Sequence, residues 1–181
     1  KTQDFFKVHR GELPVKVHYE SRDKPMSLLG IDGSRGIIYA KIQGGGQVQL
    51  ELRGLKKQNI KRFEYEFSQQ TLKDLKKLDD EQYDDPEVLD AVRPAIYKVL
   101  PFHEINPEFF PIHDNCLIYV KALIAMEQYN EALSLLYKLN LQRLDQYEYR
   151  EFSEAGLELA GKMIVANPKS ANNVKILLTK I

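Results

Sequence analysis

Residues 114–139 read DNCLIYVKALIAMEQYNEALSLLYKL, and this stretch decides the fold of the second half of the chain. Asp114 has the short acceptor side chain of a helix N-cap. The run behind it is apolar nearly all round, as in a helix that is buried on several sides. After Glu127 and Gln128 a second apolar stripe begins at Tyr129 with helical spacing. The short break predicts two antiparallel helices that pack as a hairpin.

The turn of this hairpin, residues 127–133, resembles the inter-helix turn of a tetratricopeptide repeat. In that family an aromatic residue follows the turn, and an alanine three residues later lets the helices approach; Tyr129 and Ala132 match. The family's glycine and bulky residue in the first helix are replaced by Val120 and Cys116. The resemblance covers about one repeat and implies tetratricopeptide-like helix pairing. An ordinary antiparallel helix pair in a small bundle is the alternative.

Helical periodicity extends over the rest of this half. Residues 86–100 carry an apolar face that Pro94 interrupts, which predicts a kink or two short helices. Residues 149–166 show the most regular three-four spacing, and an Asn-Pro pair follows them. Residues 170–181 predict a final amphipathic helix, which is expected to pack one stripe on its neighbour and to cap the stack with its polar side.

The first half of the chain is typical of short antiparallel strands. Strand-like segments cover residues 14–19, 26–31, 36–43, 47–53 and 60–67, and residues 54–58 predict one helical turn before the last of them. This order resembles the Src-homology-3-like small barrel. We therefore expect an α+β chain. Residues 1–67 would form a small antiparallel five-stranded β-barrel, and residues 68–181 an all-α helical-hairpin bundle that resembles tetratricopeptide repeats.

Charge divides the chain at the same place. Residues 1–67 hold 13 Lys and Arg against 8 Asp and Glu, a net charge of +5, and residues 68–181 hold 13 against 18, a net charge of −5. The opposite signs favour two modules that dock electrostatically. The whole chain is neutral, unlike a dedicated nucleic-acid binder, and it has no transmembrane run. The sequence begins at Lys1 and not at a methionine. Three explanations stay open: a signal segment was removed and the protein is exported, an upstream region was removed, or the sequence was trimmed.

No residue pattern predicts a catalytic, cofactor or metal site. The pairs His103–Glu104 and His113–Asp114 lack the spacing of a zinc-protease helix. Cys116, the single cysteine, lies on an apolar helix face and is expected to be a small buried hydrophobe. We therefore expect a non-enzyme without cofactors, while a hydrolase built from residues distant in sequence stays an open alternative.

Two sets of residues are candidate binding surfaces. The aromatic set of the helical half is expected to recognise a protein or peptide partner, and it comprises Tyr119, Tyr129, Tyr137, Phe102 and Phe109. The basic set surrounds the helical turn before the last strand and would serve the alternative, nucleic-acid binding: Arg53, Lys56, Lys57, Lys61 and Arg62. The sequence therefore favours a non-enzymatic interaction or scaffold module over a nucleic-acid binder, and it leaves the oligomeric state open.

Overall fold

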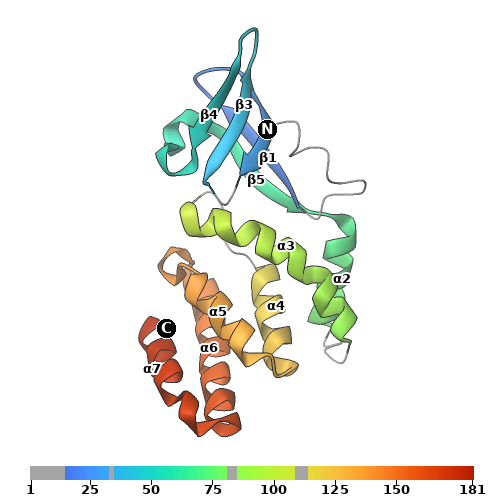
Figure 1. Cartoon of the computed structure of the whole chain (residues 1–181), viewed down its shortest axis with the longest axis vertical. Coiled ribbons are helices and arrows are strands. Elements are labelled where there is room, and N and C mark those ends of the chain that lie inside the picture. The colour runs from blue at the N-terminus through green and yellow to red at the C-terminus, as the bar shows by residue number, and fades with distance from the viewer. Residues whose placement is uncertain (1–14, 33–34, 81–84, 109–113) are drawn as a thin grey trace.

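The structure is a computed structural model, and it describes residues 15–32, 35–80, 85–108 and 114–181. Within these ranges the chain is α+β, with six α-helices and two small antiparallel sheets. The strands lie at one end of the molecule and most helices at the other, with α3 (Pro86–Ile105) running between them (Figure 1). Within the described ranges, no helix is both long enough and apolar enough to cross a membrane.

Five strands make up the N-terminal half. β1 (Val15–Ser21) pairs with β5 (Ile60–Phe67). The second sheet has the order β2 (Met26–Asp32), β3 (Ile37–Ile42) and β4 (Gln47–Glu51). Two 3-10 turns, Leu52–Gly54 and Lys57–Asn59, precede β5. Each strand begins and ends within two residues of its predicted bounds, because alternating apolar residues and turn-forming glycines mark both.

Among the described residues the predicted closed five-stranded barrel is not seen. The strands form two separate sheets, and β1 contacts β2 without a shared ladder. The register breaks between Glu20 and Ser21 on β1, and between Leu28 and Gly30 on β2. A register break of this kind leaves a residue unpaired and increases the local twist of the strand. Each break lies within the ladder of its own sheet, so β1 and β2 both depart from regular pairing where the two sheets separate.

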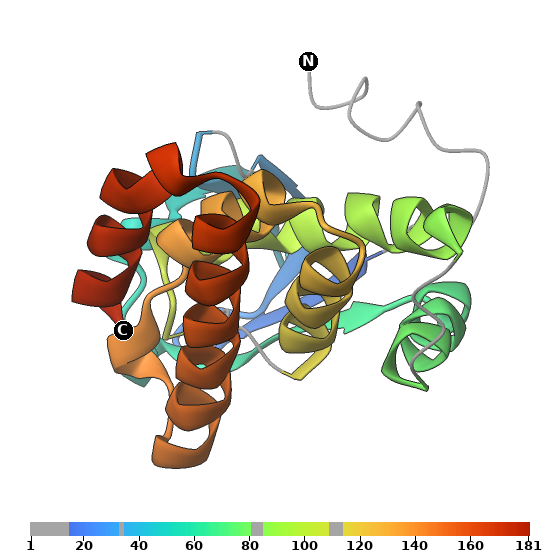
Figure 2. The same cartoon turned by 90° about the horizontal axis from the view of Figure 1, so that it is seen from below.

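Three consecutive helical hairpins form the C-terminal half. They pair α2 (Gln69–Asp79) with α3, α4 (Asp114–Ala125) with α5 (Tyr129–Lys138), and α6 (Gln146–Ala166) with α7 (Ala171–Lys180). The first helices of the hairpins pack as one row, α2 on α4 and α4 on α6, and α5 also contacts α7. Figure 2 shows this row crossing the helical half, with α6 and α7 opposite α2. The α6/α7 hairpin is therefore the last layer of the stack in the described chain.

Local sequence signals set the ends of these helices. Asp145 and Glu148 form a reciprocal capping box at the start of α6. Between α4 and α5, Glu127 adopts a φ of 60°, and the N–H of Gln128 donates to the carbonyl of Leu123 at 2.8 Å. This is the bonding of a Schellman turn, which ends a helix and reverses the chain within a few residues. The predicted hairpin break at residues 127 and 128 is therefore confirmed.

α3 is one continuous helix of 20 residues. Of the two forms that the sequence predicted at Pro94, a kink or two short helices, the structure excludes two short helices. A proline removes one N–H and leaves the carbonyl four residues earlier, that of Asp90, without its helix partner. Pro94 is exposed, so water can reach this carbonyl and the helix continues. Pro101 and Phe102 also belong to α3, which continues to Ile105.

The change from strands to helices falls at Ser68. β5 ends at Phe67, and α2 begins at Gln69. The side-chain oxygen of Ser68 accepts a hydrogen bond from the N–H of Thr71 at 3.1 Å, which makes Ser68 the N-cap of α2. This is the place where the composition of the sequence changes.

The strand half and the helical half share one hydrophobic core. Ile38 and Leu52 are fully buried and belong to the same cluster as the residues of α3 and α4. A Cβ at Gly36 would lie 3.3 Å from the Cδ1 of Ile105, and the side-chain amide of Asn106 donates to the carbonyl of Leu52 at 3.2 Å. The end of α3 therefore holds the β3 and β4 region against the helices.

α7 packs on α6 as the sequence predicted, but its outer side differs from the prediction. Val174 and Leu177 are buried, and a Cβ at Gly156 of α6 would lie 3.1 Å from the Cδ1 of Ile181. The remaining surface of α7 is not uniformly polar, because Leu178 is 45% exposed. The final layer therefore presents apolar side chains where a polar cap was expected.

Candidate interaction surfaces

The predicted aromatic set does not lie on one surface. Tyr119 is 0% exposed, and Phe102 is buried in the core. This corrects the expectation that both face a partner, because a buried side chain offers no area to a bound protein. Tyr129 is half-buried against the core, and Tyr137 is exposed. Phe109 lies outside the described residues.

Tyr119 instead belongs to a network of polar groups centred on Glu131. The Nε of Arg93 lies 2.8 Å from Glu131 Oε1, and the Nη2 of Arg93 lies 3.0 Å from Oε2. The hydroxyls of Tyr119 and Tyr97 donate to Oε1 at 2.8 Å and 3.2 Å. These four donors come from α3 and α4, and the acceptor from α5. The network therefore ties three helices together at the side chain of Glu131.

The electrostatics of this network are those of a stable ion pair. Burial by itself raises the pKa of the Glu131 carboxyl, but the hydrogen bonds from Arg93 and then Tyr119 lower it, and the net pKa lies below its usual value. Burial, and then the charge of Glu131, raise the pKa of Tyr97 to about 12. The carboxylate is therefore ionised and the tyrosine neutral around pH 7, which suits a structural connection between helices.

A shallow hollow of about 770 Å³ lies where α3, α5 and α7 end, and no pattern in the sequence predicted it. Tyr137 lies at its edge, and its hydroxyl donates to the carbonyl of Asn173 at 3.1 Å. The ammonium of Lys180 lies 5.9 Å from the centre of the Tyr137 ring and donates to the Tyr137 carbonyl. Burial lowers the pKa of Lys180. These contacts hold Tyr137 against α7, so it is only partly available to a partner.

The predicted basic patch is partly neutralised by acidic neighbours. Lys61 pairs with Glu20 at 3.1 Å, and the Nε of Arg62 lies 2.7 Å from Glu64. Arg53 and Lys56 are exposed, and the side chain of Lys57 is not among those that the structure describes. Exposed ion pairs leave less positive charge for a phosphate backbone. The structure therefore adds no support for nucleic-acid binding.

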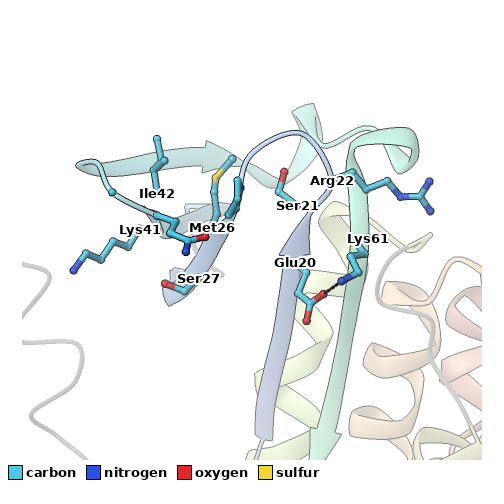
Figure 3. A pocket seen from close by; sticks show the side chains of 11 residues that line it. Glu20, Ser21, Arg22, Met26, Ser27, Lys41, Ile42 and Lys61 are labelled. Atoms are coloured by element: carbon cyan, nitrogen blue, oxygen red, sulfur yellow. Dashed lines mark ion pairs between the residues drawn. The ribbon is translucent and has the colours of Figure 1, made fainter.

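A second hollow, of about 1000 Å³, opens at the seam between the two sheets. Figure 3 shows its lining side chains, with the ion pair between Glu20 and Lys61 on the β1–β5 side. Arg22 and Lys41 extend away from the seam in opposite directions in this view. Because the cations do not converge, the hollow does not form an anion site.

The exposed apolar side chains concentrate on the last hairpin. Of the nine large hydrophobic side chains that are exposed in the described ranges, seven belong to α6 and α7. Leu157 is 56% exposed and Ile164 is 45% exposed, and Gly161 lies between them on the same side of α6. We define the outer hairpin face as Leu157, Gly161 and Ile164 of α6 together with Leu178 of α7.

Two relationships place this face on the outside of the stack. On α6, Glu151 points toward α4, where it pairs with Lys121 at 3.2 Å, and Leu157 lies roughly 120° around the helix from it. On α7, Lys180 lies beside α5, and Leu178 lies roughly 160° around that helix from it. The outer hairpin face therefore points away from α4 and α5.

The sequence predicted only a regular helix over residues 149–166, and this prediction did not single out Leu157 or Ile164 as exposed. At 100° per residue Ile164 lies roughly 100° from the buried Met163, so it is outside a narrow core stripe. A stricter helical projection would have found Leu157, Gly161 and Ile164 as a second stripe. The sequence alone could not say that no helix in the described ranges covers it.

Two residues that sequence analysis weighed as chemical groups are structural. His103 is buried, and its Nε2 accepts a hydrogen bond from the N–H of Asn140 at 3.0 Å. Cys116 is buried, as predicted, and burial raises the pKa of its thiol to about 12. Both groups therefore stabilise the helical core, and neither is presented to a substrate.

Comparisons with known proteins add no relative to this picture. No family model matches the sequence, and no curated protein or solved structure is found to be similar to the chain.

Proposed function

We propose that this chain is a non-enzymatic protein-interaction module, and that the outer hairpin face binds a helix of a protein partner. The observation that carries the proposal is the concentration of exposed apolar side chains on α6 and α7. Three of these seven side chains, Leu157, Ile164 and Leu178, belong to the outer hairpin face, and exposed apolar patches mark protein–protein contacts more often than single scattered hydrophobes do. The face replaces the aromatic set as the candidate surface.

The packing of the earlier hairpins supports a helix as the bound element. α4 presents one side to α6, and α5 presents one side to α7. The outer hairpin face lies on the opposite sides of α6 and α7, so a further helix could continue the row in the same way. An amphipathic helix fits a groove between two helices through residues three, four and seven positions apart. Leu157, Gly161 and Ile164 have this spacing.

Finer fold assignments belong to the same proposal. The paired helices and the Schellman turn at Glu127 are compatible with tetratricopeptide-like stacking, in which each hairpin packs on the next. The strand order β1–β5 and β2–β3–β4, with 3-10 turns before β5, is compatible with an open form of the Src-homology-3-like barrel. Both folds serve mainly as binding scaffolds, but fold alone does not assign a function.

Site-specific photo-cross-linking tests the proposal. A photoreactive phenylalanine analogue replaces Leu157, and in a matched control it replaces Leu72, which is 37% exposed on α2 at the other end of the stack. Each protein is irradiated in an extract of its native cells. We expect the analogue at position 157 to form a discrete adduct with another protein. An excess of unlabelled wild type should abolish this adduct, and an excess of unlabelled Leu157→Glu should not. Equal adducts from both positions, or none from position 157, would refute the outer hairpin face as the binding surface.

A further inference from the structure

Gly161 occupies an unusual position for a glycine. It lies inside α6 and is exposed, and among the described residues a Cβ built on it would meet no atom within 4 Å apart from the local backbone of α6. By contrast, Gly156 of the same helix is buried, and a Cβ there would press on Ile181. Glycine in a helix interior lowers stability relative to alanine. Packing among the described residues explains Gly156 but not Gly161, and a close approach by another helix is one use that a glycine at position 161 would serve.

The apolar side chains around Gly161 are arranged almost symmetrically along α6. Leu157 precedes it by four residues, and Ile164 follows it by three. If a second α6 crosses the first antiparallel at Gly161, Leu157 of each copy lies opposite Ile164 of the other. The two glycines then meet at the crossing, where the absence of side chains lets the helices approach. In a two-fold contact residue i of one copy meets residue j of the other and the reverse, and the spacing of Leu157 and Ile164 about Gly161 permits this reciprocal pairing.

Charge complements this arrangement. Glu154 lies seven residues before Gly161 and pairs with Arg150 of its own helix at 2.9 Å, and the exposed Lys169 lies eight residues after Gly161. An antiparallel pair therefore brings Glu154 of one copy toward Lys169 of the other at both ends of the contact. Complementary charges at the rim favour this register.

We propose that the bound helix is α6 of a second copy of this chain, so that the outer hairpin face forms a two-fold dimer. A two-fold axis perpendicular to α6 leaves both α7 helices on the same side. Leu178 of each copy therefore joins the contact, and the two last hairpins stack as a four-helix layer. This inference rests on the proposed function, because it names the partner of the same face.

Sedimentation equilibrium of the full chain over a wide concentration range tests the association. We expect a monomer–dimer equilibrium, and Leu157→Glu should raise its dissociation constant about tenfold or more, because two carboxylates would be buried against apolar side chains. Leu72→Glu is the matched control on an exposed leucine and should leave the dissociation constant unchanged. Circular dichroism of each variant checks that the fold is kept.

A cysteine cross-link tests the geometry. Gly161→Cys should form a disulfide-linked dimer under mild oxidation, since a crossing at this residue brings the two Cα atoms within the roughly 4.4–6.8 Å that a disulfide needs. Lys73→Cys on the exposed side of α2 should not, and the native Cys116 is buried. Wild type that stays monomeric at every concentration overturns the dimer. A dimer that is insensitive to Leu157→Glu and does not cross-link through residue 161 also overturns it.

The two proposals fail in different ways. One result is a monomeric wild type whose position 157 still forms an adduct with a different protein, which unlabelled wild type abolishes. This result would refute the dimer and support the outer hairpin face as a binding surface. An adduct that consists of two copies of this chain supports both. The absence of both the dimer and any adduct removes the face as a binding surface.

Discussion

Arg93 of α3 and Glu131 of α5 form a two-pronged ion pair, with distances of 2.8 Å from Nε to Oε1 and 3.0 Å from Nη2 to Oε2. The two helices belong to different hairpins, so the pair connects the first hairpin with the second. Tyr119 of α4 adds a third helix through its hydroxyl. Paired hydrogen bonds between a guanidinium and a carboxylate fix orientation as well as distance. We infer that this pair sets the angle at which the hairpins stack.

Removing the carboxylate should therefore destabilise the helical half. We expect Glu131→Ala to lower the free energy of unfolding by about 1–3 kcal/mol, because the buried hydroxyl of Tyr119 loses its acceptor. Glu104→Ala is the matched control: its contact with Lys138 is 4.0 Å long and exposed, so the change should stay within about 0.5 kcal/mol. Urea denaturation measures both. Equal effects would mean that the network carries no special stability.

The same carboxylate predicts a pH dependence. The pKa of Glu131 is lower in the folded protein than its ordinary value, so the ionised carboxylate adds stability above the unfolded pKa of about 4.3. This stability is lost as the pH falls through the folded pKa. The difference in unfolding free energy between wild type and Glu131→Gln should therefore be largest near pH 7 and shrink toward pH 3. Urea denaturation at a series of pH values measures it, and a difference that does not change with pH would contradict the assignment.

The sequence predicted those features that depend on local patterns. The strand bounds, the break at Glu127 and the buried Cys116 follow from spacing, turn residues and an apolar helix face. The sequence could not predict that α3 continues past Pro94, because the effect of this proline depends on whether its side of the helix faces water. The exposure of the outer hairpin face depends on which helices of the chain pack together, and spacing within one helix does not contain that information.

The buried role of Tyr119 has a similar cause. A large aromatic residue in an apolar helix has the same local pattern whether it packs inside or faces a partner. Its hydroxyl is satisfied by Glu131, twelve residues later in the chain, and by nothing in its own helix. The pairing becomes visible only once α4 and α5 are placed side by side.

A larger side chain at Ala132 tests how closely the α4/α5 hairpin is packed. Ala132 is fully buried in α5, three residues after Tyr129, so a larger side chain would push α5 away from its neighbours. We expect Ala132→Leu to lower the free energy of unfolding by roughly 1–3 kcal/mol. Ser134→Leu, at an exposed position of the same helix, should have little effect. Thermal denaturation compares the two, and unaltered stability of Ala132→Leu would reject the close packing of this hairpin.

Replacement of Glu127 by glycine is expected to stabilise the protein. The φ of 60° at Glu127 lies in the left-handed region, which costs a residue with a Cβ roughly 1–2 kcal/mol. Glycine reaches this conformation without that cost but loses more backbone entropy on folding. We expect Glu127→Gly to raise the free energy of unfolding by about 0.5–1 kcal/mol. Gln128→Gly, at a neighbouring residue with a φ of −87°, should lower it. Destabilisation by both glycines would show that the turn does not hold Glu127 in this conformation.

Leu52 tests whether the two halves fold as one unit. It is fully buried in the cluster that joins strands and helices, and its carbonyl accepts the hydrogen bond from Asn106. We expect Leu52→Ala to lower the free energy of unfolding by about 2–5 kcal/mol. Because the core is shared, amides of the strands and of the helices should lose protection from hydrogen exchange together. Leu72→Ala, at an exposed leucine, is the control.

The salt dependence of unfolding distinguishes a shared hydrophobic core from docking of the two halves through charge. The sequence places +5 on residues 1–67 and −5 on residues 68–181, and attraction between exposed charges weakens as salt rises. Burial of Ile38 and Leu52 is not screened in this way. We therefore expect a single unfolding transition at both low and high salt, with Leu52→Ala equally destabilising in each. Two transitions that separate in high salt would instead show that charge holds the halves together, because the apolar junction would then be too weak to couple them.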